Sequence, residues 1–215
     1  MENKIILIDK PAGISSFGVV AKVRGKLKTE FGHKVKVGHT GTLDPFATGL
    51  LILLSGKMTK KSNEFLKQDK EYIATLKLGY TSTTGDPEGE ITKCAEICPS
   101  SEEGLSDVLQ SFIGEIEQTP SKYSAIKING QRAYKLARQN KDFEIPSRKV
   151  KIYNIEILEY NYPILKIKTQ VSSGTYIRTL AEDIGKKLST GAYLTELRRI
   201  KIGDYSVEDA EKLVL

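Results

Sequence analysis

The chain has 215 residues, a formal net charge of +6 from 33 Lys plus Arg against 27 Asp plus Glu, two cysteines and two histidines. Its length suggests one domain that buries roughly 70% of its unfolded surface. So few cysteines and histidines exclude most structural zinc sites, whereas the positive charge favours an anionic partner. We interpret Cys94 and Cys98 as free thiols in a reducing cytoplasm.

The first half of the chain predicts short strands mixed with helices. Apolar alternation, helical spacing and turn residues predict a strand ended by a Pro-Ala-Gly turn, a Ser-capped helix, a buried strand, a helix, an alternating strand and a turn-rich loop. These are, in order, residues 5–13, 15–28, 50–54, 59–68, 70–79 and 81–90. The alternating strand places Tyr72 on its apolar face with Ala74, Leu76 and Leu78.

The second half continues the same pattern. It predicts a strand, Asn-Gly turn and helix, then a hairpin of two strands, an amphipathic helix and a last strand. These are residues 123–139, 148–160 with 163–171, 172–188 and 192–203. Strand pairs with inserted helices predict an α+β fold with a largely antiparallel or mixed sheet, and favour it over a doubly wound α/β fold.

Apolar length and common motifs exclude several classes of function. The longest uninterrupted apolar run, Leu50 to Leu54, is far shorter than the roughly 20 residues that cross a bilayer, and the first residues lack the features of a signal peptide. The segment from Gly49 to Met58 has the wrong spacing for a P-loop, and neither GxGxxG nor GxSxG occurs. We therefore expect a cytoplasmic protein without a membrane segment, cofactor or metal.

One acid stands alone in the segment GHTGTLDPFATG, which runs from Gly38 to Gly49: it is Asp44. An Asp-Pro step starts turns readily, so Asp44 can have a purely structural role. Alternatively, the glycines permit close approach of a ligand, and Pro45 holds Asp44 extended, in a polar site around one anionic nucleophile. His39 is open to the same two interpretations, as a functional residue or as a loop histidine that caps the chain.

This segment resembles the catalytic motif of the tRNA pseudouridine synthases that modify uridine 55 in the T arm, the TruB type, in its bacterial form. The similarity spans almost the whole chain, because four other segments resemble the same family in the same order: DKPAGISSF, KEYIATLKLGYTSTTGDPEG, YSAIKINGQRAYKLAR and SSGTYIRTLAEDIG. The resemblance implies the pseudouridine synthase catalytic fold, a mixed, largely antiparallel β-sheet flanked by helices and RNA-binding loops. It also implies an isomerase that turns uridine into pseudouridine without a cofactor or metal.

By resemblance, Asp44 is the catalytic residue, which either attacks the sugar or abstracts a sugar proton. A single acid suits an isomerisation, whereas glycoside hydrolysis commonly uses two carboxylates. The family pattern pairs Arg178 with this aspartate, where a guanidinium would orient the carboxylate and lower its pKa by roughly one to three. The residues alone also allow a plainer role for Arg178, as an exposed helix pair with Glu182 worth a few tenths of a kcal/mol.

The resemblance also assigns the substrate-binding residues. The target nucleotide must be flipped out of the T loop, and the family uses His39 at the place of the displaced base. Tyr72 would stack on the target base, and Tyr176 and Leu197 would line the uridine pocket, although each of the three also suits a core position. Phosphates would be held in a salt-dependent manner by basic residues. The candidates are Lys34, Lys36, Arg198, Arg199 and Lys201.

Two departures from the family pattern limit these expectations. Pro120-Ser121 stands where the family often has Pro-Pro, and we expect no small C-terminal RNA-binding domain after the last predicted strand. We therefore expect one catalytic domain over residues 1–215, a monomer whose partner is the T arm of tRNA, with no obligate protein partner. The main rival is a non-catalytic tRNA-binding or tRNA-folding module, and a third interpretation is a nucleosidase or base-excision glycosylase.

Overall fold

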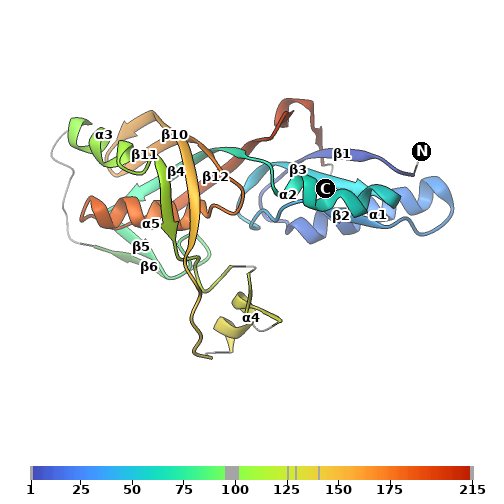
Figure 1. Ribbon diagram of the computed structural model, residues 1–215, viewed down its shortest axis with the longest axis horizontal. Coiled ribbons are helices and arrows are strands. Elements are labelled where there is room, and N and C mark those ends of the chain that lie inside the picture. The colour runs from blue at the N-terminus through green and yellow to red at the C-terminus, as the bar shows by residue number, and fades with distance from the viewer. Residues whose placement is uncertain (1, 95–101, 125, 129, 140, 214–215) are drawn as a thin grey trace. The chain divides into compact units, whose positions relative to one another are not determined.

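The computed structural model describes residues 2–94, 102–124, 126–128, 130–139 and 141–213. The chain divides into two compact units (Figure 1): Met1–Ile73 together with Leu197–Leu215 form the first, and Ala74–Glu196 form the second. The second unit is therefore one continuous segment, whereas the first is assembled from both parts of the chain that flank it. Strands β4 (Lys70–Leu78) and β12 (Ala192–Ile202) contribute residues to both units.

The first unit is built on a mixed sheet with the strand order β14-β1-β3-β12, in which β2 also pairs with β3 and β13 with β12. Its remaining elements are β1 (Ile5–Lys10), α1 (Ser16–Phe31), β2 (Val37–His39), β3 (Thr48–Ser55), η1 (Gly56–Lys61), α2 (Ser62–Leu66), β13 (Tyr205–Ser206), η2 (Val207–Asp209) and β14 (Glu211–Lys212). Strands β1 and β2 pair antiparallel with β3, whereas β12 runs parallel to it.

Strand β3 explains why the chain contains its longest apolar run. Leu51 and Leu53 pack into a cluster with the apolar side chains of α1, while Leu50, Ile52 and Leu54 pack with Phe65 of α2. Both faces of β3 are therefore buried, and a strand covered on both faces needs a continuous apolar sequence rather than an alternating one. This central strand is also where the segment that carries Asp44 ends.

Helix α1 has the start that the sequence predicts. The hydroxyl of Ser15 accepts a hydrogen bond from Gly18 N–H (3.0 Å) and caps the helix. At the other end Gly32 adopts φ 75°, a left-handed conformation that closes the helix. The side chains between these ends that face the sheet are fully or nearly fully buried: Val19, Val20, Val23 and Leu27.

The second unit has the strand order β12-β4-β11-β10-β7 in the sheet, and β10 pairs antiparallel with both β11 and β7. Its other elements are β5 (Tyr80–Ser82), β6 (Ile91–Lys93), α3 (Glu102–Gln110), β7 (Gly114–Gln118), β8 (Lys127–Ile128), β9 (Gln131–Arg132), α4 (Ala133–Arg138), β10 (Arg148–Asn161), β11 (Ile164–Val171) and α5 (Ile177–Lys187). Helix α3 contacts both α5 and β10. The long β10–β11 hairpin is the one that the sequence predicts.

The α+β prediction is confirmed, with differences in detail. The predicted helix over residues 59–68 is a 3₁₀ turn followed by the five-residue α2. Helix α3 and strand β7 were not predicted, and the expectation that β12 is the last strand is wrong, because β13 and β14 follow. Such two-residue strands are too short for a periodic signal. The single-domain assignment stays a prediction.

Two further expectations concern membrane segments and thiols. Within the described part of the chain, no helix combines the length and apolar character that spanning a membrane requires. Cys94 carries a free thiol, as predicted. Cys98 lies outside the described residues.

Candidate active site

Asp44 lies in the loop of residues 40–47, which joins β2 to β3 in the first unit. Its side chain is half-buried, and its backbone carbonyl accepts a hydrogen bond from Ala47 N–H (3.1 Å). This bond closes a turn over residues 44–47, so the turn that an Asp-Pro step favours is present in the backbone. The carboxylate is therefore carried by a loop of defined conformation.

Lys10, the last residue of β1, holds the residue that follows Asp44. Its side chain is fully buried, and the ammonium donates to three backbone carbonyls. These belong to Pro11 (2.9 Å), Ile14 (2.8 Å) and Pro45 (3.2 Å). Hydrogen bonds from a charged donor contribute about 1.5–3 kcal/mol each, so Lys10 ties the turn after β1 to the Asp44 loop. Sequence reasoning missed this residue, although it lies in the DKPAG segment that carries the resemblance.

His39 ends β2 immediately before the loop and is half-buried. Gly41 N–H donates a hydrogen bond to its Nδ1 (3.4 Å). In this arrangement the neutral ring carries its proton on Nε2. The capping role that the sequence left open for His39 is therefore observed, and its role at a displaced base stays a prediction.

Tyr72 and Leu197 belong to β4 and β12, in the parts of these strands that lie in the first unit. Each side chain is 7% exposed. Each side chain therefore lies mostly in the core, as the residues alone suggest. Their contact with a target base stays a prediction.

Arg178 lies in the first turn of α5 in the second unit and is 6% exposed. One guanidinium nitrogen donates to Asp86 Oδ2 and to Thr84 O, both at 2.9 Å, and the other donates to Tyr123 O (3.3 Å). The alternative of an exposed pair with Glu182 is therefore wrong, because the guanidinium is buried. Its pairing with Asp44 joins residues of different units and stays a prediction.

Asp86 is a buried partner of Arg178 that sequence reasoning missed. Among the described residues it is the one buried carboxylate, at 3% exposed. Its Oδ1 accepts from Thr84 Oγ1 (2.6 Å) and Glu88 N–H (3.0 Å), while Oδ2 meets Arg178. A buried, fully bonded carboxylate fixes the guanidinium in one orientation. The available signal is a second Asp-Pro step, in GDPEG, within the segment for which the sequence predicts a turn-rich loop.

Tyr176 is the N-cap residue of α5 and is half-buried. The side-chain amide of Gln118 bonds both its backbone N–H (3.0 Å) and its carbonyl (3.3 Å). Arg148 of β10 lies opposite Gln118 of β7 in the strand register. Its guanidinium lies 4.5 Å from the centre of the Tyr176 ring. Both the backbone and the ring of Tyr176 are therefore held in place at the start of α5, the helix that also carries Arg178.

The predicted phosphate-binding residues divide into three groups. Lys34 and Lys36 are exposed, as a phosphate contact requires. Arg198 and Lys201 have carboxylate partners, Asp9 (2.8 Å) and Glu71 (3.7 Å) respectively. Arg199 is only 1% exposed, so its assignment to phosphates is wrong. An alternating strand hides every second side chain, and Arg199 occupies such a position.

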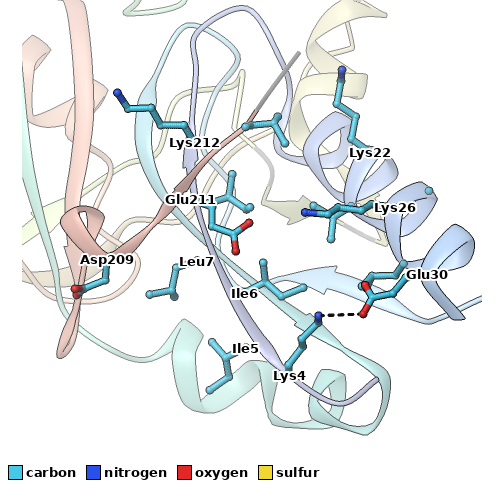
Figure 2. Close-up of a pocket in the computed structure, with 15 residues that line it drawn as sticks. Lys4, Ile5, Ile6, Leu7, Lys22, Lys26, Glu30, Asp209, Glu211 and Lys212 are labelled. Atoms are coloured by element: carbon cyan, nitrogen blue, oxygen red, sulfur yellow. Dashed lines mark ion pairs between the residues drawn. The ribbon is translucent and has the colours of Figure 1, made fainter. Parts of the chain in front are cut away.

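A cavity of about 840 Å³ lies beside β1 and α1 in the first unit. Figure 2 shows its mixed lining, with Ile6 and Leu7 among lysines and acids, and with Lys4 paired to Glu30 (3.9 Å). No sequence-predicted site residue belongs to the lining of this cavity. It is separate from the site proposed for Asp44.

Two models of known protein families together match nearly the whole chain. A family model described as TruB family pseudouridylate synthase (N terminal domain) matches residues 26–177. A second model, described as tRNA pseudouridylate synthase B C-terminal domain, matches residues 178–214.

Two curated relatives match with similar identity. The tRNA pseudouridine synthase B of Phocaeicola vulgatus is 47% identical over 97% of this chain and 89% of its own length. That of Francisella tularensis subsp. tularensis is 48% identical over 98% of this chain and 68% of its own length.

Solved structures show the same fold. A chain in the crystal structure of a Cbf5-Nop10-Gar1 complex matches with a TM-score of 0.72 at 30% identity, over 99% of this chain and 52% of its own. A chain of an H/ACA RNP bound to a substrate RNA containing 2′-deoxyuridine matches with a TM-score of 0.70 at 28% identity, over 98% and 51%. The chain thus spans about half the length of these solved chains.

Proposed function

Because the chain belongs to the TruB family of pseudouridylate synthases, we propose that it isomerises uridine to pseudouridine in tRNA, at position 55 of the T loop. The observation that carries this proposal is the Asp44 loop: one half-buried acid stands in a segment whose backbone is bonded to the turn after β1. The relatives named tRNA pseudouridine synthase B support tRNA as the substrate.

The proposed reaction breaks the N1–C1′ glycosidic bond, rotates the base while it stays bound and joins C5 to C1′. The C5–H bond then breaks and its proton passes to solvent, while N1 takes up a proton. Atoms balance without hydrolysis or a redox step. Asp44 acts on the sugar, either as a nucleophile or as a base that removes a sugar proton. One carboxylate suffices for either route, since no water has to be activated.

Arg178 is proposed to favour the ionised form of Asp44 during this reaction. A guanidinium next to a carboxylate stabilises its charge, and a planar fork also fixes its direction. In the second unit, Asp86, Thr84 and Tyr123 accept hydrogen bonds from this guanidinium. The orientation of Arg178 therefore does not depend on the substrate.

The substrate enters as a flipped nucleotide. His39 takes the place of the displaced base, Tyr72 stacks on the uracil, and Tyr176 and Leu197 line the pocket. Exposed Lys34 and Lys36 precede β2 and hold phosphates, so binding weakens as salt increases. We expect a monomer that acts in the cytoplasm without an obligate protein partner.

Asp44→Asn tests the assignment of the catalytic residue. The variant is expected to bind T-arm RNA but to release no tritium from 5-tritiated uridine, because an amide neither attacks the sugar nor removes its proton. Asp204→Asn is the matched control, since it makes the same change in the exposed turn between β12 and β13. Unchanged tritium release by Asp44→Asn would contradict the assignment.

Two readouts distinguish the rival functions. A non-catalytic tRNA-binding module binds the T arm but releases no tritium in the wild-type protein. A glycosylase replaces the base by a hydroxyl group from water and so lowers the mass of the RNA, whereas isomerisation leaves the mass unchanged. Mapping pseudouridine in tRNA from cells that lack the protein then tests the position, because loss confined to the T loop supports position 55.

A further inference from the structure

The guanidinium of Arg199 bonds the backbone both before and after Asp44. Its Nε donates to Leu50 O (2.8 Å), in β3, and a terminal nitrogen donates to Gly41 O (3.1 Å), at the start of the loop. Arg199 comes from β12, which runs parallel to β3 at this point. Since the guanidinium is rigid and planar, these two bonds fix the distance between the beginning of the loop and the strand that follows it.

Gly49 brings the two strands close enough for this contact. It adopts φ 100°, and a Cβ there would lie 2.2 Å from the carbonyl oxygen of Arg199. Only glycine therefore permits this approach. A side chain at position 49 would push β12, and with it the Arg199 guanidinium, away from the loop.

Ser16 provides a second, independent restraint on the backbone next to Asp44. It is the first residue of α1 and is 2% exposed. Its hydroxyl accepts a hydrogen bond from Leu43 N–H and donates one to Leu43 O, each at 2.8 Å. Leu43 directly precedes Asp44, so the backbone on the N-terminal side of Asp44 is bonded to the helix.

We propose that Arg199 and Ser16 are positioning residues that hold the backbone on the N-terminal side of Asp44 in the geometry its reaction requires. The inference rests on the proposed function of Asp44. Both side chains bond backbone atoms of the segment, so they act through the position of Asp44. A displacement of about 1 Å at a reacting group costs roughly 100-fold in rate, which is why such a restraint matters.

A simple structural role makes a different prediction. A serine that only stabilises the fold would lower the melting temperature when it is replaced, without changing the turnover of the folded protein. Ser15 is such a residue, because its hydroxyl caps α1 through Gly18 N–H. The neighbouring serines Ser15 and Ser16 thus form a matched pair for the experiment.

The experiment compares Ser16→Ala with Ser15→Ala at a temperature where circular dichroism shows both to be folded. Tritium release from T-arm RNA gives kcat and KM, and NMR hydrogen exchange gives the protection of the Leu43 amide. Ser16→Ala is expected to lower kcat by roughly 10–100-fold, to leave KM within about two-fold and to speed Leu43 exchange. Ser15→Ala is expected to lower the melting temperature while leaving kcat and Leu43 exchange unchanged. Equal kcat values for the two variants overturn the proposal.

Arg199 is tested by Arg199→Lys and Arg199→Met. Lysine retains the charge and can reach one carbonyl, so the proposal expects kcat to fall in the order wild type, Arg199→Lys, Arg199→Met. Equal kcat in the wild type and a folded Arg199→Met overturns the role of this residue, and if Arg199→Met does not fold, Arg199→Lys decides by the same criterion. A wild-type protein that releases no tritium contradicts the proposed function instead. In that case faster Leu43 exchange in Ser16→Ala than in Ser15→Ala supports the restraint, and equal exchange overturns it.

Discussion

The two units hold their principal candidate residues in different ways. In the first unit, contacts from Lys10, Ser16 and Arg199 reach the backbone around Asp44. In the second unit, the partners of Arg178 bond its guanidinium directly, and one of them is the buried carboxylate of Asp86. These bonds in the first unit are made to the main chain around Asp44, whereas those in the second unit are made to the side chain of Arg178.

This difference follows from what each group is proposed to do. A carboxylate that reacts with a sugar has to change its bonding during the reaction, so its position is best set from the backbone. A guanidinium that stabilises a charge keeps its bonds throughout, and preorganised charges of this kind cost no reorganisation at the moment of reaction. The four predictions below test this comparison.

The largest effect is expected on stability when Arg178 is removed. Arg178→Met leaves Asp86 buried without its cation, which costs about 3–5 kcal/mol of unfolding free energy. Arg198→Met is the matched control: its partner Asp9 lies in a pair whose arginine side chain is 40% exposed, so we expect a loss below about 1 kcal/mol. Urea unfolding measures the loss of unfolding free energy in both variants. Equal losses would show that the buried pair of Arg178 and Asp86 contributes no more to stability than the more exposed pair of Arg198 and Asp9.

Gly49→Ala tests the close approach of β3 and β12. The added Cβ meets the Arg199 carbonyl, so this change should cost about 1–3 kcal/mol more than an alanine that suffers only from an unfavourable φ. Gly114→Ala supplies that reference, because Gly114 has φ 113° and a Cβ there would meet no other described side chain or backbone atom within 4 Å. Equal losses of stability in thermal unfolding would contradict the close contact.

Asp86→Asn separates orientation from charge in the second unit. Asparagine keeps the shape but removes the negative charge beside Arg178, so the guanidinium is held less firmly. We expect kcat for tritium release to fall about 10-fold, equivalent to about 1.4 kcal/mol, with a smaller change in KM. A change in KM alone would instead assign Asp86 to RNA binding.

The smallest effect concerns pH and Lys70 in the first unit. Burial, and then the charge of Arg199, lower the pKa of Lys70 to about 8 from its ordinary 10.5. Between these values the unfolded chain binds more protons than the native protein, so the free energy of unfolding contributed by Lys70 rises with pH. The free energy of unfolding of the wild type minus that of Lys70→Met should show this rise when both are measured by urea unfolding at about pH 7.5 and about pH 10. A difference that is flat or falls with pH would contradict it.

The sequence predicted the elements whose signals are local. The helix that begins after Ser15, the apolar run of β3 and the alternation around Tyr72 are all properties of neighbouring residues, and the structure confirms each of them. The residues alone indicated Asp44 as a candidate nucleophile, and the resemblance favoured that role and added Arg178; both roles remain proposals. What the residues alone could not supply was the set of long-range partners.

Three cases show why these partners escaped prediction: two pairs of residues and Arg199. Asp86 and Arg178 are 92 positions apart, and Lys10 and Pro45 are 35 apart, so no periodic pattern joins them. The prediction for Arg199 was wrong for another reason: a basic residue in a strand with other basic residues suggests exposure to solvent and contact with phosphates. Its burial depends on which face of β12 meets the Asp44 loop, and that is decided by the packing of segments from opposite ends of the chain.

The division of the first unit has a consequence for synthesis on the ribosome. Loop residues 40–47 are made before Ala74–Glu196, whereas Arg199 is made only after the whole of this segment. The nascent chain therefore passes through a long interval in which the second unit can fold while the Asp44 loop still lacks its bond to β12. The restraint from Arg199 is completed only after residue 199 has been made, so premature termination before residue 199 yields a product that retains Asp44 but not this restraint.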